Sequence, residues 1–136
     1  MHSHSPATPL KIFLVEDSIL VRRRLATLMG LIDGVEIVGE AEDSSRALSG
    51  IVASQAHVAV LDLHLAGSSG MDVLTALARS GRPVIPIVLT NHCTAPVRQA
   101  CLSAGAKYFF DKTSEFKLAL DTIEKIARDR SAGTTQ

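Results

Sequence analysis

The chain alternates five times between a short apolar run and a longer segment whose apolar residues recur at helical spacing. Short apolar runs bounded by turn residues are typical of buried strands. Strands that are separated by helices pair in parallel, because parallel strands need a long crossover connection. The helices then cover both faces of the sheet through right-handed crossovers. The alternation therefore predicts an α/β fold with a doubly wound parallel sheet of five strands, written (βα)5.

The positions of these runs give the expected elements. We expect strands over residues 11–15, 35–40, 57–61, 84–89 and 107–110. We expect helices over about residues 18–29, 71–79, 95–104 and 114–128, and one that begins at Asp43 or Ser44. Pro86 has no N–H to give to a ladder, so we place it near the start of its strand. The helix over residues 95–104 has only small inward residues and should be the least firmly anchored.

The length of 136 residues, with 46% apolar residues, fits a single globular domain. We predict that this domain covers residues 10–130. The polar residues 1–9 are predicted to form a flexible tail, and residues 131–136 a frayed one. His2 and His4, in the first tail, are interpreted as solvated residues rather than metal ligands.

The charge balance excludes two classes of partner. Fourteen basic and fourteen acidic residues give a formal net charge of zero, which does not indicate a surface for nucleic acid or membrane. No apolar run is long enough to span a membrane, and no signal peptide is visible. Cys93 and Cys101 do not make a disulfide framework or a zinc set. We therefore expect a cytoplasmic protein with reduced thiols.

Polar side chains stand where four of the expected strands end. Glu16 and Asp17 follow the first strand, Asp62 the third, Thr90 ends the fourth, and the fifth runs into Lys112. The carboxyl ends of parallel strands share one edge of a sheet, and ligands bind at that edge. These five side chains are therefore expected to converge there. Asp62, which ends a run buried on both faces, is the expected reacting group.

Three neighbouring carboxylates repel one another unless a cation intervenes. Oxygen ligands of high charge suit Mg²⁺, which would also screen an incoming phosphoryl group. A carboxylate such as that of Asp62 can attack phosphorus and form an aspartyl phosphate. Thr90 could then donate a hydrogen bond to the phosphate, and Lys112 could pair with it. These parts supply the positioning and charge stabilisation that phosphoryl transfer requires.

Four stretches of the chain resemble the receiver domains of two-component response regulators. They are Val15-Glu16-Asp17, Asp62 to Gly70, Leu89-Thr90 and Gly105 to Lys112. Together these motifs are highly specific, and the resemblance covers roughly residues 10–130. It implies a flavodoxin-like fold with strand order 2-1-3-4-5.

The resemblance also implies what the site does. Asp62 would accept a phosphoryl group from a sensor histidine kinase or a histidine phosphotransfer protein. Asp17, Asp62 and the backbone carbonyl of His64 would bind Mg²⁺, and Glu16 would act through water.

Thr90 and Lys112 would contact the phosphate, and Phe109 falls at the aromatic switch position. Modification would then change the surface formed by the fourth helix, the fifth strand and the fifth helix. No output domain follows within these residues, so we expect a stand-alone switch that signals to another protein and is not an enzyme in the turnover sense.

The chain departs from the family pattern at three places. Ala66-Gly67 replaces the usual Pro-Gly and removes no ligand. Thr113 replaces the proline that follows the family's lysine, so a cis bond there would cost about 3 kcal/mol and a trans bond would place Lys112 differently. Phe109 lacks the hydroxyl of a tyrosine, so a switch at this position would work by packing alone.

Two alternatives remain open. One is a small Mg²⁺-dependent phosphatase with Asp62 as nucleophile, although enzymes of that kind carry a second Asp where this chain has His64, and a cap domain is absent. The other is a receiver fold that only binds a partner and is not phosphorylated. His64 and His92 each follow a site residue by two positions, and we hypothesise that they set how fast water hydrolyses the phosphate.

Overall fold

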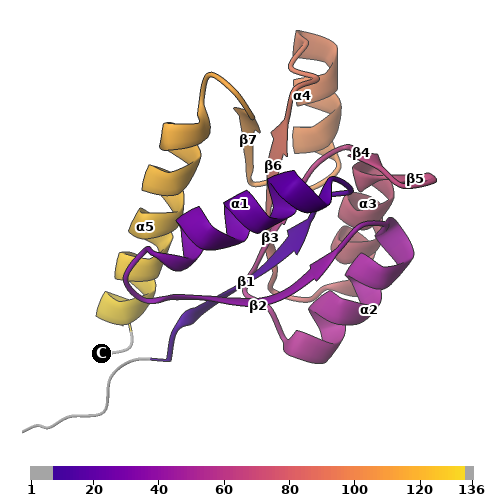
Figure 1. Cartoon of the computed structure of the whole chain (residues 1–136). Coiled ribbons are helices and arrows are strands. Elements are labelled where there is room, and N and C mark those ends of the chain that lie inside the picture. Colours follow the sequence, from indigo (N-terminus) through magenta and orange to yellow (C-terminus); the bar gives the residue numbers. More distant parts are fainter. Residues whose placement is uncertain (1–7, 134–136) are drawn as a thin grey trace, which may run out of the picture.

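The computed structural model describes residues 8–133 and shows a five-stranded parallel sheet in the order β2-β1-β3-β6-β7 (Figure 1). The strands are β1 (Leu10–Val15), β2 (Val35–Ala41), β3 (Val58–Leu61), β6 (Ile85–Thr90) and β7 (Tyr108–Asp111). The helices are α1 (Ile19–Gly30), α2 (Ser44–Ser54), α3 (Gly70–Ser80), α4 (Ala95–Ser103) and α5 (Phe116–Gly133). Counted by the five main strands, this is the predicted order 2-1-3-4-5, so the predicted flavodoxin-like fold is confirmed.

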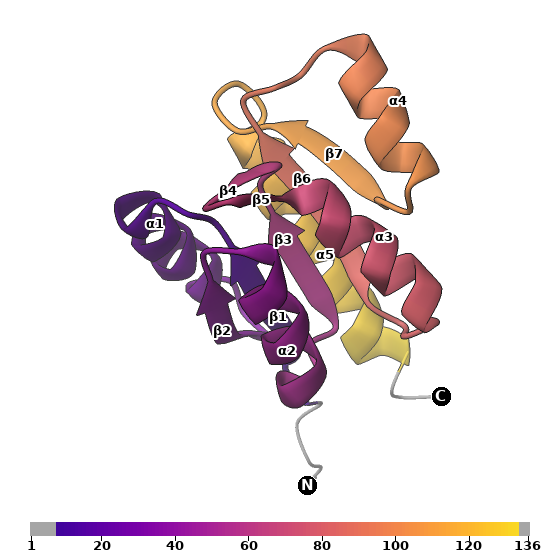
Figure 2. The ribbon, with the colours of Figure 1, turned by 90° about the vertical axis from the view of Figure 1, so that its right-hand side faces the viewer.

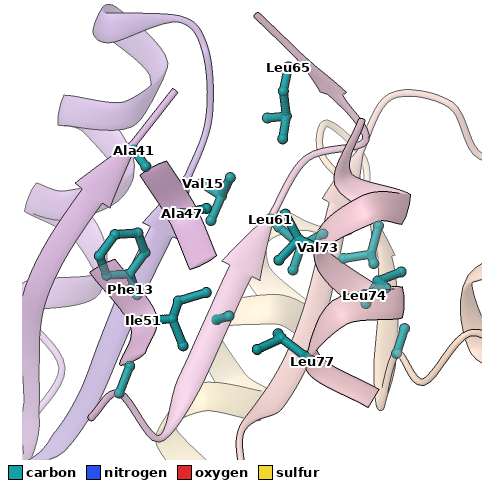
Figure 3. Close-up of a cluster of buried hydrophobic side chains, with 14 of the residues drawn as sticks. Phe13, Val15, Ala41, Ala47, Ile51, Leu61, Leu65, Val73, Leu74 and Leu77 are labelled. Carbon is teal, nitrogen blue, oxygen red and sulfur yellow. The ribbon is translucent and has the colours of Figure 1, made fainter. Parts of the chain in front are cut away.

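The helices lie on both faces of the sheet and divide the core in two (Figure 2). Along β1, Ile12 and Leu14 face α1 and α5, whereas Phe13 and Val15 face α2 and α3, because successive strand residues point to opposite faces. Figure 3 shows the second of these cores, built around Leu61 of β3. None of the helices between residues 8 and 133 has the length and apolarity needed to cross a membrane.

The structure differs from the predicted elements in two places, after β3 and at the end of the last helix. The glycine-rich segment after β3 contains a small antiparallel pair, β4 (His64–Leu65) and β5 (Ser68–Ser69). Strands of two residues are too short to show a periodic pattern, so the sequence does not predict them. The last helix ends at Gly133 rather than near residue 128, so it extends into the segment predicted as the C-terminal tail. The other predicted tail residues, 1–7 and 134–136, lie outside the described part of the chain, and His2 and His4 with them.

Pro86 is tolerated because of where β7 begins. Pro86 is the second residue of β6, and its carbonyl accepts a hydrogen bond from the Lys107 amide at 2.9 Å. The β6–β7 ladder starts one residue later, at the Ile87–Tyr108 pair. The nitrogen of Pro86 faces the side of β6 where β7 lies, but it precedes the first residue pair of that ladder. The missing N–H therefore breaks no hydrogen bond between the two strands.

Helix α4 is thinly packed, as its small inward residues predict. Cys101 is its only buried residue within the described chain, and its Sγ lies 3.7 Å from Met71 Sδ of α3. Figures 1 and 2 show α4 at the periphery of the sheet, beside β7. Little buried area holds this helix in place, so it can be displaced at low energetic cost.

The ring of Phe13 fills a space that two glycines leave open. A Cβ at Gly39 of β2 or at Gly50 of α2 would overlap this ring. The ladder between β1 and β2 also shifts register between Ile12 and Phe13. The absence of side chains at both positions therefore allows a phenylalanine to pack between β2 and α2.

We predict that Gly50→Ala destabilises the protein by about 1–2 kcal/mol, although alanine is the better helix former by about 1 kcal/mol. The added methyl group forces the Phe13 ring out of its position. Urea unfolding measures the effect, with Ser49→Ala, an exposed change in the same helix, as a near-neutral control. Gly50→Ala should cost less in a Phe13→Leu background, and equal costs in both backgrounds would contradict this explanation.

Candidate functional site

The predicted site residues lie at the carboxyl ends of neighbouring strands, and backbone hydrogen bonds hold them there. Glu16 and Asp62 directly follow β1 and β3, and the Asp62 amide donates to the Val15 carbonyl at 3.0 Å. Thr90 ends β6, and its carbonyl accepts from the Lys112 amide at 2.9 Å. The sheet therefore brings four residues that are far apart in sequence to one edge.

Lys112 joins two of the carboxylates. Its Nζ lies 2.6 Å from Glu16 Oε1 and 2.7 Å from Asp62 Oδ2. Glu16 is 3% exposed and Asp62 9% exposed, so both ion pairs are shielded from solvent. Charge-assisted hydrogen bonds of this length are stronger than neutral ones, and burial weakens screening by salt. One ammonium group thus offsets two converging negative charges.

Burial and charge act against each other at this cluster. Burial is the largest influence on Glu16 and raises its pKa above 4.5, although the hydrogen bonds from Lys112 and Ser18 act in the opposite direction. Burial alone would lower the pKa of Lys112, but its bonds to Asp62 and Glu16 outweigh that effect and raise it above 10.5. The cluster therefore favours the charged form of Lys112, and burial favours the protonated form of Glu16 more than water does.

Glu16 is fixed by groups on α1 as well. The Ser18 amide donates to Glu16 Oε2 at 3.0 Å, and Ser18 Oγ accepts from Val21 as the N-cap of α1. Arg22 Nη1 donates to the Glu16 carbonyl at 2.7 Å, and Arg22 Nε pairs with Glu40 Oε1 at 2.9 Å.

Arg22 is the functional neighbour that sequence reasoning missed. Arg22 is half-buried, whereas Arg23 and Arg24 beside it on α1 are exposed. Its partner Glu40 lies 18 residues away on β2, and helical spacing carries no signal of such a contact.

Asp62 and Thr90 are held from their own loops. Asp62 Oδ1 accepts a hydrogen bond from the Leu63 amide at 2.6 Å, which leaves Oδ2 for Lys112. The Thr90 side chain is fully buried, and its Oγ1 accepts from the His92 amide at 3.3 Å. The Cys93 thiol donates to the Thr90 carbonyl at 3.0 Å. This bond uses the thiol proton, and the pKa of Cys93 is raised to about 11, first by burial and then by Asp111.

Asp17 does not join this cluster. Its side chain is exposed and makes no hydrogen bond or ion pair within residues 8–133. The same residues contain no group of three or more His, Cys, Asp or Glu side chains arranged to hold a metal. Glu16 and Asp62 nevertheless both direct a carboxylate oxygen at one cation, the Lys112 ammonium. Carboxylate oxygens are also the ligands that Mg²⁺ prefers, so these residues fit that ion.

The departure from the family pattern after Lys112 does not displace this residue. Residues 8–133 contain no cis peptide bond, so the bond to Thr113 is trans, and Lys112 still reaches both carboxylates. Asp111 Oδ1 accepts from the Thr113 and Ser114 amides at 2.8 and 3.0 Å and closes the turn that follows.

Phe109, at the predicted switch position, points into the core. It is 6% exposed, and the guanidinium carbon of Arg98, on α4, lies 5.8 Å from the centre of its ring. Arg98 Nη1 also donates to the Phe109 carbonyl at 3.3 Å. The same aromatic residue therefore contributes to both the core and the attachment of α4 to β7.

Comparison with known proteins identifies the family. A family model described as the response regulator receiver domain matches residues 12–124. The chain belongs to this family. Receiver domains of this kind belong to two-component, phosphorylation-based signalling, and the resemblance predicted from the sequence is confirmed.

A curated relative and a solved structure are both similar to this chain in sequence. The nitrate/nitrite response regulator NarP of Escherichia coli K12 is 34% identical over 122 residues, which are 90% of this chain and 57% of NarP. The signal receiver domain of NarL from Mycobacterium tuberculosis is 27% identical, with a TM-score of 0.78 and coverage of 92% of this chain and 98% of that one.

The fold is also similar to a chain of the CheX–CheY complex with BeF₃⁻ and Mg²⁺ from Borrelia burgdorferi. The TM-score is 0.78 at 20% identity, and the match covers 87% of this chain and 89% of that chain. The receiver domain described here spans little more than half the length of NarP.

We predict that Lys112→Gln lowers the free energy of unfolding by about 1–3 kcal/mol at pH 7.5, because two buried carboxylates lose their cation. A raised pKa of Glu16 means that the folded state binds this proton more readily than the unfolded chain, so stability is lost as pH rises through that pKa. Without Lys112 this loss should grow. The variant's deficit should therefore shrink at pH 4.5, as measured by urea unfolding at both pH values.

The matched control is Lys117→Gln, which removes an exposed pair with Asp121 at 3.3 Å. It should change stability by less than about 0.5 kcal/mol at either pH. A deficit of Lys112→Gln that is as large at pH 4.5 as at pH 7.5 would show that the two carboxylates do not depend on this lysine.

Proposed function

We propose that Asp62 accepts a phosphoryl group from a sensor histidine kinase or a histidine phosphotransfer protein and that the protein acts as a switch. The observation that supports this most directly is the position of the Asp62 carboxylate, 2.7 Å from the Lys112 ammonium at the open end of a buried strand. A carboxylate at such an edge is a nucleophile next to a fixed positive charge.

The chemistry follows from the neighbours of Asp62. A carboxylate oxygen attacks phosphorus, the bond between phosphorus and the donor nitrogen breaks, and an aspartyl phosphate forms. Lys112 pairs with the transferred phosphate oxygens as a point charge. Thr90 donates its hydroxyl proton to the same phosphate after its side chain moves toward Asp62. Because Lys112 already contacts Asp62, its charge needs little reorganisation when the phosphate arrives.

We propose that Mg²⁺ is the cofactor of this transfer. Asp17, Asp62 and the backbone carbonyl of His64 would hold it directly, and Glu16 through water. When bound, Mg²⁺ neutralises the carboxylates and screens the incoming phosphoryl group. The support is the oxygen donor set of Glu16 and Asp62 and the position of Asp17, whose exposed side chain directly follows Glu16 in the sequence. Lys112 would then exchange its carboxylate contacts for phosphate contacts.

The response would appear on the surface formed by α4, β7 and α5. Movement of Thr90 toward the phosphate vacates a buried position, and Phe109 follows by packing, since it has no hydroxyl to form a bond. Cys101 and Arg98 supply the attachments of α4 described above, so this helix can respond to a small displacement. A downstream protein would recognise the changed surface, and we place the whole exchange in the cytoplasm.

The phosphatase alternative is less well supported. His64, which stands where such an enzyme has its acid/base Asp, is exposed in β4, and within residues 8–133 its imidazole makes no hydrogen bond or ion pair with Asp62. Steady turnover of a phosphate ester would favour the phosphatase, whereas one slowly lost acyl phosphate per chain would favour the switch. A receiver-like module that only binds a partner would form no acyl phosphate at all.

We predict that the protein gains the mass of one phosphoryl group when incubated with acetyl phosphate and Mg²⁺, and that Asp62→Asn does not. An amide oxygen in place of the carboxylate removes the nucleophile. Intact-mass spectrometry measures the gain, and EDTA should suppress it. Equal phosphorylation of the Asp62→Asn variant would contradict the assignment of Asp62, and labelling of another residue would identify the true acceptor.

We further predict that replacing His64 and His92 together by alanine speeds loss of the phosphate. Their rings lie 3.9 Å apart in the segments that directly follow Asp62 and Thr90, and we expect their removal to admit water to the phosphate. A threefold to tenfold faster rate is expected, roughly 0.7–1.4 kcal/mol in barrier height. The decay is followed by intact mass, with His57→Ala, at the opposite end of β3, as control. An unchanged rate in the double variant would show that the two rings do not control hydrolysis.

A further inference from the structure

Two imidazole rings, from the segments that follow β3 and β6, lie against each other. His64 lies in β4, two residues after Asp62, and His92 follows β6, two residues after Thr90. Their ring centroids are 3.9 Å apart, with the ring planes tilted by 41°. The two strands that lead into these loops, β3 and β6, are neighbours in the sheet. The pairing of these two strands therefore brings the two histidines close together.

The backbone at both histidines is held in place. His64 pairs with Ser69 in the antiparallel β4–β5 ladder (Figure 2), and the His92 amide donates to Thr90 Oγ1 at 3.3 Å. Both side chains are exposed, and no protein group between residues 8 and 133 makes a hydrogen bond or an ion pair to either imidazole. Their ring nitrogens are therefore available to a ligand from solvent.

From this geometry we propose that His64 and His92 form a binding site for a borderline divalent metal ion such as Zn²⁺. Imidazole nitrogens bind such ions at about 2.0–2.1 Å, which puts two nitrogens on one ion about 3 Å apart. Rings whose centres are 3.9 Å apart reach that spacing by small side-chain rotations. Water molecules complete the coordination, because only two protein ligands are present.

This site is chemically distinct from the carboxylate cluster. Mg²⁺ prefers oxygen ligands and stays with Asp62 and its neighbours, whereas imidazole suits Zn²⁺, Ni²⁺ and Cu²⁺. A cavity of about 460 Å³ adjoins the pair, with Met71 and Val97 in its wall, and leaves room for the water ligands.

A bound ion would also restrain the switch. It would tie the β4–β5 hairpin to the loop between β6 and α4, whose other attachments include the bond from the Cys93 thiol to the Thr90 carbonyl. Since this loop must rearrange when Thr90 moves, the ion stabilises the resting conformation. Any ligand that binds only the folded state also raises the melting temperature.

The test is a calorimetric titration of Zn²⁺ into the full chain at pH 7.5 in excess Mg²⁺. The parent protein carries His2→Gln and His4→Gln, so that the N-terminal histidines do not bind the ion. We expect one site, with affinity at least about tenfold weaker after His64→Gln or His92→Gln. In the parent, Zn²⁺ should shift the imidazole nitrogen resonances of both residues in NMR spectra.

The control is His57→Gln, because His57 Nδ1 already accepts a hydrogen bond from the Lys11 amide at 2.9 Å. Its affinity for Zn²⁺ should equal that of the parent. No binding by the parent, or equal binding by the His64→Gln and His92→Gln variants, would overturn the proposal. Neither result bears on phosphorylation of Asp62, because the titration involves no phosphoryl donor.

Discussion

The structure of this site depends on one ammonium group shared by two buried carboxylates. Glu16 and Asp62 arrive from β1 and β3, and neither could be buried as an anion without a neighbouring positive charge. Lys112 supplies that charge from the residue that directly follows the edge strand β7. The parallel topology makes this meeting possible, because it brings the ends of these strands to one edge.

Much of the fold could be predicted because its signals are periodic. The five strands and five helices follow from alternation, and convergence of Glu16, Asp62, Thr90 and Lys112 follows from parallel pairing. The β4–β5 pair could not be predicted, since two-residue strands have no period. The contact of Arg22 with Glu40 could not be predicted either. It joins side chains of α1 and β2, and the spacing of residues within one element gives no information about contacts between elements. The sequence also carried no signal that Asp17 is exposed while Glu16, the residue before it, is buried.

The stable and the movable parts of the molecule are separated. Both cores centre on β1, β3 and β6, and the Phe13 ring between two glycines shows how closely β2 and α2 are fitted there. In contrast, α4 has one buried residue, Cys101, and the guanidinium of its Arg98 contacts Phe109 of β7. A switch that begins at Asp62 can therefore act on α4 without disturbing the centre of the sheet.

The shared lysine is tested most directly by following the Glu16 carboxyl carbon through a pH titration by NMR. We expect a midpoint above 4.5 in the native protein, since burial dominates. The midpoint should rise further in Lys112→Gln, which removes the compensating cation, and fall in Asp62→Asn, which removes a neighbouring negative charge and leaves Lys112 to Glu16 alone. A midpoint that stays the same in all three proteins would contradict the view that Glu16, Asp62 and Lys112 form one electrostatic unit.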